Sequence, residues 1–253
     1  MPKGISLHIG VNNVSPKAAD YTNRNLSLLK TCENDARKME EIAKMEGFAK
    51  TYSLYTKDAT RHNFEKYFIE IAGELIPGDL FLLTFSGHGL GIPDQNDDED
   101  DGQDESWCLY DQILIDDDLS RYLAQIRQGV RVVVVSDSCS SGTMLRLDDG
   151  DSRWKRPTLK RPFPNESNIM ASVVLLAACM DNYKAYAMEG SPLSVFTQDL
   201  WRTWNDGKFK GNYQDFLDNI RAFTSDDHQT PYYYTAGLDK DIFLDLKPFS
   251  IEG

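Results

Sequence analysis

The chain has 253 residues, of which 41% are hydrophobic, and it contains 12 tyrosines and 12 phenylalanines. This length and composition are typical of a folded protein with one large core or two small ones. The formal net charge of −13 argues against nucleic acid as a partner, because phosphate binding needs clustered lysine and arginine.

Short hydrophobic runs alternate with helical patterns along the chain. Strands are predicted at residues 5–11, 51–55, 79–85, 130–135, 173–178 and 232–235, and helices at 25–45, 59–76, 119–128, 194–204 and 213–223. The run at 130–135 is apolar at five of its six positions, as a parallel strand covered on both faces should be. The repeated strand–helix units favour an α/β fold, with a mostly parallel six-stranded sheet and helices on both faces.

Two polar segments interrupt this order. Residues 93–106 are strongly acidic, and residues 146–168 contain three prolines and alternate acidic with basic side chains. The second segment is predicted to be a surface linker. Because it lies between strands of one sheet, we expect a single domain over residues 1–253.

The four cysteines indicate the cellular compartment of the protein rather than a disulfide framework. Cys32, Cys108, Cys139 and Cys179 form no CxxC pair, so neither a zinc site nor a disulfide framework is expected. No targeting pattern follows Met1, and no apolar stretch approaches the roughly 20 residues that a membrane span requires. We expect a cytoplasmic protein whose thiols stay reduced, with no membrane partner.

Two motifs directly follow two of the predicted strands. Ser86-Gly87-His88-Gly89 follows the strand at 79–85, and the segment 136–142, which contains Cys139, follows the strand at 130–135. The carboxyl ends of parallel strands border the crevice in which ligands bind. A cysteine beside a histidine is the minimum apparatus for thiolate attack on a carbonyl.

In this order the motifs resemble the caspase-like cysteine peptidases, and most closely the metacaspases and their bacterial relatives. The separation of 51 positions between His88 and Cys139 is close to that in caspases. The stretch 29–36 resembles the family's early Cys-x-Asn-Asp motif, residues 116–119 its acidic helix start, and residues 229–231 a motif near its C-terminus. The resemblance covers nearly the whole chain and implies the caspase-hemoglobinase α/β/α sandwich.

The resemblance assigns Cys139 as nucleophile and His88 as general base. A free thiol has a pKa near 8.5, and a nearby histidine and a following helix start would both favour the thiolate. The backbone N–H groups of Cys139 and Gly89, both expected on tight turns, are predicted to form the oxyanion hole. The alternatives are a structural cysteine and a turn histidine. Ser140 stands where the family usually has histidine, and activity is expected to survive this change.

The resemblance, together with the charge of the matching residues, predicts which residue precedes the cleaved bond. Caspases proper hold an aspartate with arginines, whereas metacaspases hold arginine or lysine with acids. The matching positions are Asp35, Ser86 and Asp137, with Cys32 beside them, and Asp181 is a further acid at the same sheet edge. A carboxylate facing a guanidinium makes a bidentate pair, so cleavage after Arg or Lys is predicted. The alternatives are a solvated helix acid for the first aspartate and a turn-fixing role for the second.

No cofactor is required for thiol chemistry, but the resemblance raises Ca²⁺ as an activator. Related metacaspases bind it through the acidic pair at the helix start, an acid in the preceding loop and an aspartate beyond the nucleophile. Asp116 and Asp117 match the pair, and residues 94–105 supply loop candidates. Arg146 stands at the position beyond the nucleophile, and a cation there opposes a hard dication. A simply solvated acidic loop is the alternative.

The linker 146–168 places basic residues near the nucleophile. Arg153, Lys155 and Lys160 are candidates for self-cleavage, whereas Arg156 and Arg161 precede prolines, which usually block proteolysis. An ordinary polar loop is the alternative.

Two functions therefore compete. The first is a cysteine endopeptidase acting on protein or peptide substrates with a basic residue before the cleaved bond. The second is a catalytically weak regulatory or calcium-responsive binding module. Intact His88 and Cys139 favour the first, and Ser140 and Arg146 leave room for the second. Metacaspases are generally monomeric, so a monomer is expected from the resemblance alone.

Overall fold

The computed structural model describes residues 1–93, 103–139, 168–178, 190–224 and 231–252. Six strands form the main sheet: β1 (Gly4–Gly10), β2 (Lys50–Tyr55), β3 (Leu80–His88), β8 (Arg131–Cys139), β9 (Ser172–Ala177) and β10 (Tyr232–Ala236). Two short hairpins follow β3: β4 (Ile92–Pro93) with β5 (Gln103–Asp104), and β6 (Ser106–Cys108) with β7 (Ile113–Ile115). The α-helices are α1 (Cys32–Met45), α2 (Arg61–Glu74), α3 (Asp116–Leu123), α4 (Val195–Trp204), α5 (Tyr213–Phe223) and α6 (Lys240–Leu244).

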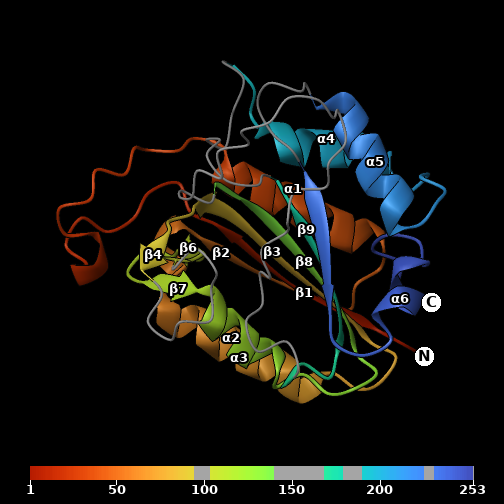
Figure 1. Cartoon of the computed structure of the whole chain (residues 1–253). Coiled ribbons are helices and arrows are strands. Elements are labelled where there is room, and N and C mark those ends of the chain that lie inside the picture. The colour runs from red at the N-terminus through yellow and green to blue at the C-terminus, as the bar shows by residue number, and fades with distance from the viewer. Residues whose placement is uncertain (94–102, 140–167, 179–189, 225–230, 253) are drawn as a thin grey trace, which may run out of the picture.

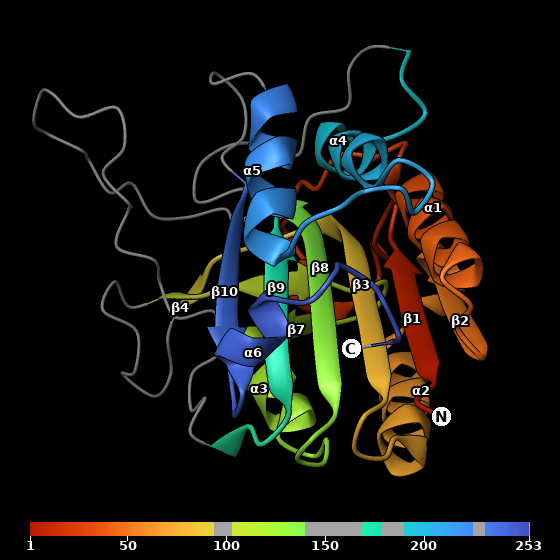
Figure 2. The same ribbon diagram turned by 90° about the vertical axis from the view of Figure 1, so that its right-hand side faces the viewer.

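The strands of the main sheet lie in the order β10-β9-β8-β3-β1-β2, as Figure 2 shows. Every neighbouring pair is parallel except β10 with β9, which is antiparallel. The predicted mostly parallel six-stranded sheet is therefore confirmed. β3 and β8 lie at its centre, so the two motif-bearing strands are neighbours.

Helices cover both faces of the sheet. α1, α4 and α5 lie on one face, and α2 and α3 on the other (Figure 1). The alternation along β8 divides its valines between the two cores: Val132 and Val134 pack on the side of Phe64 in α2, and Val133 and Val135 on the side of Met39 in α1. This double coverage explains why the strand is almost continuously apolar. No helix in the described ranges is both long and apolar enough to cross a membrane.

Several element boundaries differ from the prediction. β3 and β8 continue to His88 and Cys139, so the motif residues belong to the ends of the strands rather than to turns after them. α3 begins at Asp116, earlier than expected, and the hairpins β4–β5 and β6–β7 and the helix α6 were not predicted. The strand extension has a simple cause, because each strand has its neighbour available for backbone pairing up to these residues.

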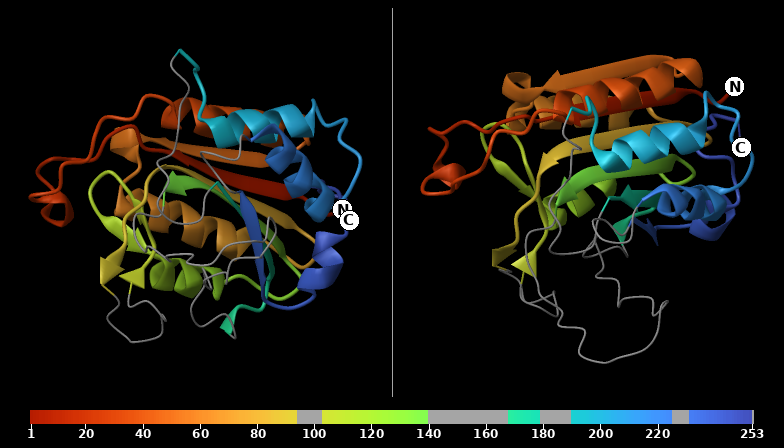
Figure 3. Two further views of the ribbon diagram at one scale, coloured as in Figure 1. Left: turned by 45° about the horizontal axis from the view of Figure 1, so that its top comes forward. Right: turned by 90° about the horizontal axis from the view of Figure 1, so that it is seen from above.

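The helix predicted from residue 25 begins only at Cys32, so its first part is wrong. The backbone before it bonds elsewhere: Leu29 N–H donates to the carbonyl of Asn12 at 2.8 Å, and the Asn12 side chain accepts from Glu33 N–H at 3.3 Å. α1 also starts directly against the end of β1, where a Cβ on Gly10 would lie 2.3 Å from the Cys32 carbonyl oxygen. The segment between β1 and α1 reaches out beyond the sheet in Figure 3.

Candidate active site

The register of the central strands places the predicted dyad side by side. β3 and β8 pair in parallel from Leu80 opposite Arg131 to His88 opposite Cys139. Two residues 51 positions apart in sequence thereby become neighbours at the carboxyl end of the sheet. Adjacent strands lie about 4.8 Å apart, which brings the two backbones within reach of side-chain contact. The side chain of Cys139 lies outside what the structure describes, so this strand-end site, His88 and Cys139, rests on backbone position.

The His88 ring is held by a main-chain group. Its Nε2 lies 2.7 Å from the carbonyl oxygen of Ser27. A carbonyl can only accept, so Nε2 carries the proton in this contact and Nδ1 of the neutral ring is left as the basic nitrogen. The arrangement supplies the orienting third group of a nucleophile–base–orienter constellation. The sequence does not reveal this third member, because a backbone carbonyl has no residue-type signature.

An aromatic pair supports the strand ends. Trp107 stacks on Phe85 with ring centroids 4.7 Å apart and planes 6° from parallel, and its indole N–H donates to Ser136 Oγ at 3.0 Å. Gly89 makes an antiparallel bridge with Trp107. A Cβ on Gly87 would lie 2.7 Å from the Phe85 ring, so glycine is required there by close approach. Trp107 is 7% exposed, so it is a packing residue of this end of the sheet.

One premise of the oxyanion-hole prediction is wrong. Cys139 is the last residue of β8 and Gly89 lies in the bridge after β3, so neither occupies a tight turn. Neither glycine of the motif has a positive φ. The assignment of their N–H groups to the oxyanion hole stays a prediction.

The structure brings together four of the predicted specificity residues, which we call the acidic pocket: Cys32, Asp35, Ser86 and Asp137. Ser86 lies opposite Asp137 in the register of β3 and β8, and its hydroxyl donates to Asp35 Oδ2 at 2.9 Å. Asp35 is 1% exposed and Asp137 2%, so neither is the solvated acid that was the alternative for Asp35. The acidic pocket therefore spans α1, β3 and β8.

Two hydroxyl residues at the start of α4, the N-cap Ser194 and Thr197, add further contacts, and neither was predicted from the sequence. The N–H of Ser194 donates to Asp35 Oδ1 at 2.9 Å, and its hydroxyl donates to Asp137 Oδ2. The hydroxyl of Thr197 donates to the same Oδ2 at 2.6 Å. The available signal was a serine at the first position of the helix predicted over 194–204, since serine is a common N-cap, but nothing in the sequence said where that helix end would point.

Burial dominates the electrostatics of the pocket. Burial, and then repulsion from Asp137, raise the pKa of Asp35 to about 8. Burial likewise raises the pKa of Asp137 against the hydrogen bonds from Ser194 and Thr197, which lower it. Burial raises the pKa of the Cys32 thiol to about 12, so this cysteine stays protonated and is no rival nucleophile. Two buried carboxyl groups this close favour holding a proton at neutral pH.

A small cavity lies between the two acids. Asp35, Ser86, Asp137 and Thr197 are among the residues that line it, and it has room for about one water molecule. Asp137 Oδ1 is buried and has no hydrogen-bond partner among the described residues. An unpaired buried acceptor costs about 1–3 kcal/mol, so this oxygen favours any donor that enters.

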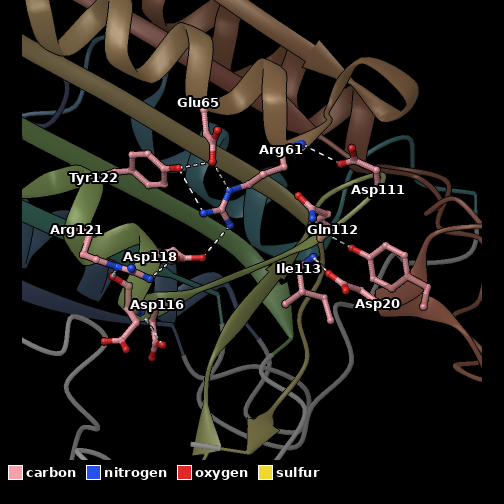
Figure 4. Close-up of polar contacts among 12 residues, drawn as sticks. Asp20, Arg61, Glu65, Asp111, Gln112, Ile113, Asp116, Asp118, Arg121 and Tyr122 are labelled. Carbon is pink, nitrogen blue, oxygen red and sulfur yellow. Dashed lines mark hydrogen bonds and ion pairs between the residues drawn. The ribbon is translucent and has the colours of Figure 1, made fainter. Parts of the chain in front are cut away.

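The predicted calcium residues lie at the start of α3. Asp116 is 8% exposed, and its carboxylate accepts from the N–H groups of Asp117 at 2.9 Å and Glu105 at 3.3 Å. The third acid of this run, Asp118, instead pairs with Arg61 at 2.8 Å, and Figure 4 shows the network that joins them to Glu65 and Tyr122. The described residues form no cluster of three or more metal ligands. Since Ca²⁺ takes six to eight oxygens, two carboxylates alone do not complete a site.

Four further predicted residues lie outside the described ranges. They are Asp181 of the proposed pocket and the self-cleavage candidates Arg153, Lys155 and Lys160. Their roles stay predictions.

Comparisons with known proteins show the family to which this chain is similar. The family model described as caspase domain (peptidase C14) matches residues 3–243. Metacaspase-1 of Plasmodium falciparum is 30% identical over 179 residues, which cover 64% of this chain and 28% of the relative. Metacaspase-6 of Arabidopsis thaliana is 27% identical over 173 residues, which cover 64% of this chain and 44% of the relative. The matched part of the chain thus spans less than half the length of these curated relatives.

Solved structures extend the likeness to the whole chain. The crystal structure of protein GSU0716 from Geobacter sulfurreducens is 35% identical, covers 99% of both chains and gives a TM-score of 0.79. Caspase-1 from Spodoptera frugiperda gives a TM-score of 0.61 at 12% identity, over 94% of this chain and 90% of that one. This second likeness shows the fold, which is the predicted caspase-like α/β sandwich.

Proposed function

The chain belongs to the caspase-domain family of peptidases, and from that premise we propose that it is a cysteine endopeptidase with Cys139 as nucleophile and His88 as general base. The observation that carries the proposal is the register of β3 and β8, which makes these two residues neighbours. The contact from Ser27 to His88 Nε2 supports it, because it leaves Nδ1 to take the thiol proton.

The reaction follows from these roles. The Cys139 thiolate attacks the scissile carbonyl, and the carbonyl π electrons move to its oxygen, which the N–H groups of Gly89 and Cys139 stabilise. His88, protonated by the thiol, returns the proton to the leaving amine as the C–N bond breaks. Water, deprotonated by His88, then hydrolyses the thioester and regenerates the thiol.

Cleavage after Arg or Lys is the second part of the proposal. Two buried carboxyl groups face one cavity, and Asp137 Oδ1, which has no partner within the described ranges, is an acceptor for an entering guanidinium or ammonium. The cavity holds about one water molecule, so a basic side chain enters only if the pocket widens. Asp181 is proposed as a further acid of the same pocket.

Entry of a cation is linked to proton release. A cation is stabilised by an ionised carboxylate, whereas the pKa of Asp35 in the empty pocket is raised to about 8. Below this pH, binding must displace a proton, so KM for basic substrates is expected to rise as the pH falls from 8 to 6. The pH dependence of kcat, by contrast, reports the catalytic groups of the complex.

Ca²⁺ enters the proposal as an activator with no part in the chemistry. Asp116 and Asp117 would supply carboxylate oxygens, and further oxygens would have to come from elsewhere. Self-processing at Arg153, Lys155 or Lys160, a monomeric state and a cytoplasmic location complete the proposal.

The test uses fluorogenic peptides ending in Arg, Lys or Asp, with the wild type and Cys139→Ala, each with Ca²⁺ or a chelator. Cleavage after Arg or Lys that disappears in the variant is the expected result. Cleavage after Asp alone would overturn the specificity, and no cleavage in any arm would favour a regulatory module. A cleavage rate that is equal with Ca²⁺ and with chelator, together with an unchanged melting temperature, would show that Ca²⁺ is not an activator.

A further inference from the structure

Ser194 contacts both acids of the acidic pocket from a single residue. Its backbone N–H donates to Asp35 at 2.9 Å, and its hydroxyl donates to Asp137. The same hydroxyl accepts the N–H of Thr197 at 3.2 Å and so forms the N-cap of α4. We propose that Ser194 is a positioning residue for specificity, which holds the two carboxylates ready for a basic substrate side chain. The inference rests on the proposed cleavage after Arg or Lys.

The orientation of Asp137 is the second observation behind this assignment. The hydroxyls of Ser194 and Thr197 both donate to Oδ2, and the buried Oδ1 has no partner among the described residues. One oxygen is therefore anchored and the other is left for a ligand. A serine needed only as a helix cap would have no reason to donate to a buried carboxylate as well.

Ser194 also joins elements that carry the two acids separately. Asp35 comes from α1 and Asp137 from β8, and the contacts that bring them to α4 pass through Ser194 and Thr197. Thr197 reaches Asp137 through its hydroxyl, whereas Ser194 bonds to both acids. The loss of the Ser194 hydroxyl is therefore expected to change the spacing of the two carboxyl groups as well as the orientation of the Asp137 carboxyl group.

The surroundings of the pair show which groups favour its ionised form. Asp137 repels the negative charge of Asp35, and burial, together with both acids, raises the pKa of the Cys32 thiol, which stays protonated. The hydrogen bonds that favour the ionised form come from Thr31 before α1, from Ser86 of β3, and from Ser194 and Thr197 at the start of α4. Donors at the positive N-terminal end of α4 thus stabilise the ionised carboxylates, as a nearby basic side chain would.

The decisive variants are Ser194→Ala, Ser194→Thr and Ser194→Gly. Alanine and glycine remove the hydroxyl but keep the backbone N–H, and glycine is the better tolerated N-cap if the alanine variant fails to fold. Threonine restores the hydroxyl. Thr60→Ala is the matched control, because Thr60 caps α2 with the same 3.2 Å bond from Asn63 N–H, on the face of the sheet away from the pocket.

KM and kcat for Arg and Lys peptides are measured from pH 6 to 9, together with the melting temperature. We expect Ser194→Ala and Ser194→Gly to raise KM about tenfold, because each removes one hydrogen bond to an ionised carboxylate. The rise of KM toward low pH should begin at a higher pH, kcat should change less than about twofold, and Ser194→Thr should restore the wild-type profile. Thr60→Ala should lower only the melting temperature.

Two negative outcomes are distinguishable. If the wild type cleaves after Arg or Lys but the Ser194 variants lose only melting temperature, Ser194 is a helix cap and the inference fails while the proposed function stands. If the wild type, with and without Ca²⁺, cleaves no basic substrate, the proposed specificity fails and the inference falls with it.

Discussion

The strand-end site and the acidic pocket lie at the same end of β3 and β8 but are held in different ways. His88 and Cys139 are brought together by backbone register, and the His88 ring is held by the Ser27 carbonyl. The acidic pocket is held by side chains, through hydroxyl groups that donate to carboxylates. The main chain thus positions the groups of the proposed chemistry, whereas side chains position the groups of the proposed specificity.

This difference has a consequence for substitutions. A main-chain contact survives almost any change of side chain, whereas a buried hydroxyl–carboxylate contact is lost with one atom. Specificity should therefore change through single substitutions that leave the strand-end site intact.

The largest loss of activity is expected from a substitution in the strand-end site. His88→Ala removes the proposed base and should lower kcat/KM about 10²–10⁴-fold, with the melting temperature nearly unchanged. Ser27→Ala should change kcat/KM less than about twofold, because the carbonyl remains and the side chain is exposed. A large loss in Ser27→Ala would show that a side chain, not the main chain, holds the histidine.

The next largest effect, a rise in KM, is expected from a substitution in the acidic pocket. Asp35→Asn keeps the shape but removes a charge, and should raise KM for Arg and Lys peptides by about 10–100-fold, as expected for losing a charge-assisted contact. kcat should fall much less, because the strand-end site does not depend on this side chain. An equal loss in kcat with KM unchanged would mean that the two regions are not separable.

The same variant should be more stable than the wild type at high pH. The pKa of Asp35 is raised to about 8 in the folded state, whereas an unfolded aspartate titrates near 3.9. The folded state therefore binds more protons between these values, and its free energy of unfolding falls as the pH rises from about 4 to 8. The difference in melting temperature between Asp35→Asn and the wild type should grow across this window. A difference that is constant with pH would contradict the raised pKa.

Sequence patterns predicted the sheet and its central strands, and the resemblance to the caspase-like peptidases predicted the grouping of Asp35, Ser86 and Asp137. β8 is recognisable from its valines, and the pocket residues from their place in motifs. The start of α1 was not predictable, since Leu28 and Leu29 continue the helical spacing while their backbone lies in another conformation. Local pattern does not report that Asn12 competes for these backbone groups.

Ser27 and Ser194 were missed for different physical reasons. Ser27 acts through its carbonyl, which every residue has, and its place depends on the path of a loop. Ser194 looks like an ordinary N-cap, and its contact with Asp35 joins positions 159 residues apart. Contacts of this kind arise only when the helices are in place on the sheet.

The smallest expected effect asks whether the strand-end site depends on any side chain beneath it. Trp107→Phe keeps an aromatic ring over Phe85 but removes the indole N–H bond to Ser136, a loss of about 1 kcal/mol. If backbone register holds the site, kcat/KM should fall by less than about fivefold, and the melting temperature should drop slightly. Trp201→Phe is the control, because that ring packs under Lys38 on α1 and touches neither region. A loss above about 100-fold in Trp107→Phe, with no change in melting temperature, would show that the strand-end site is built by side chains after all.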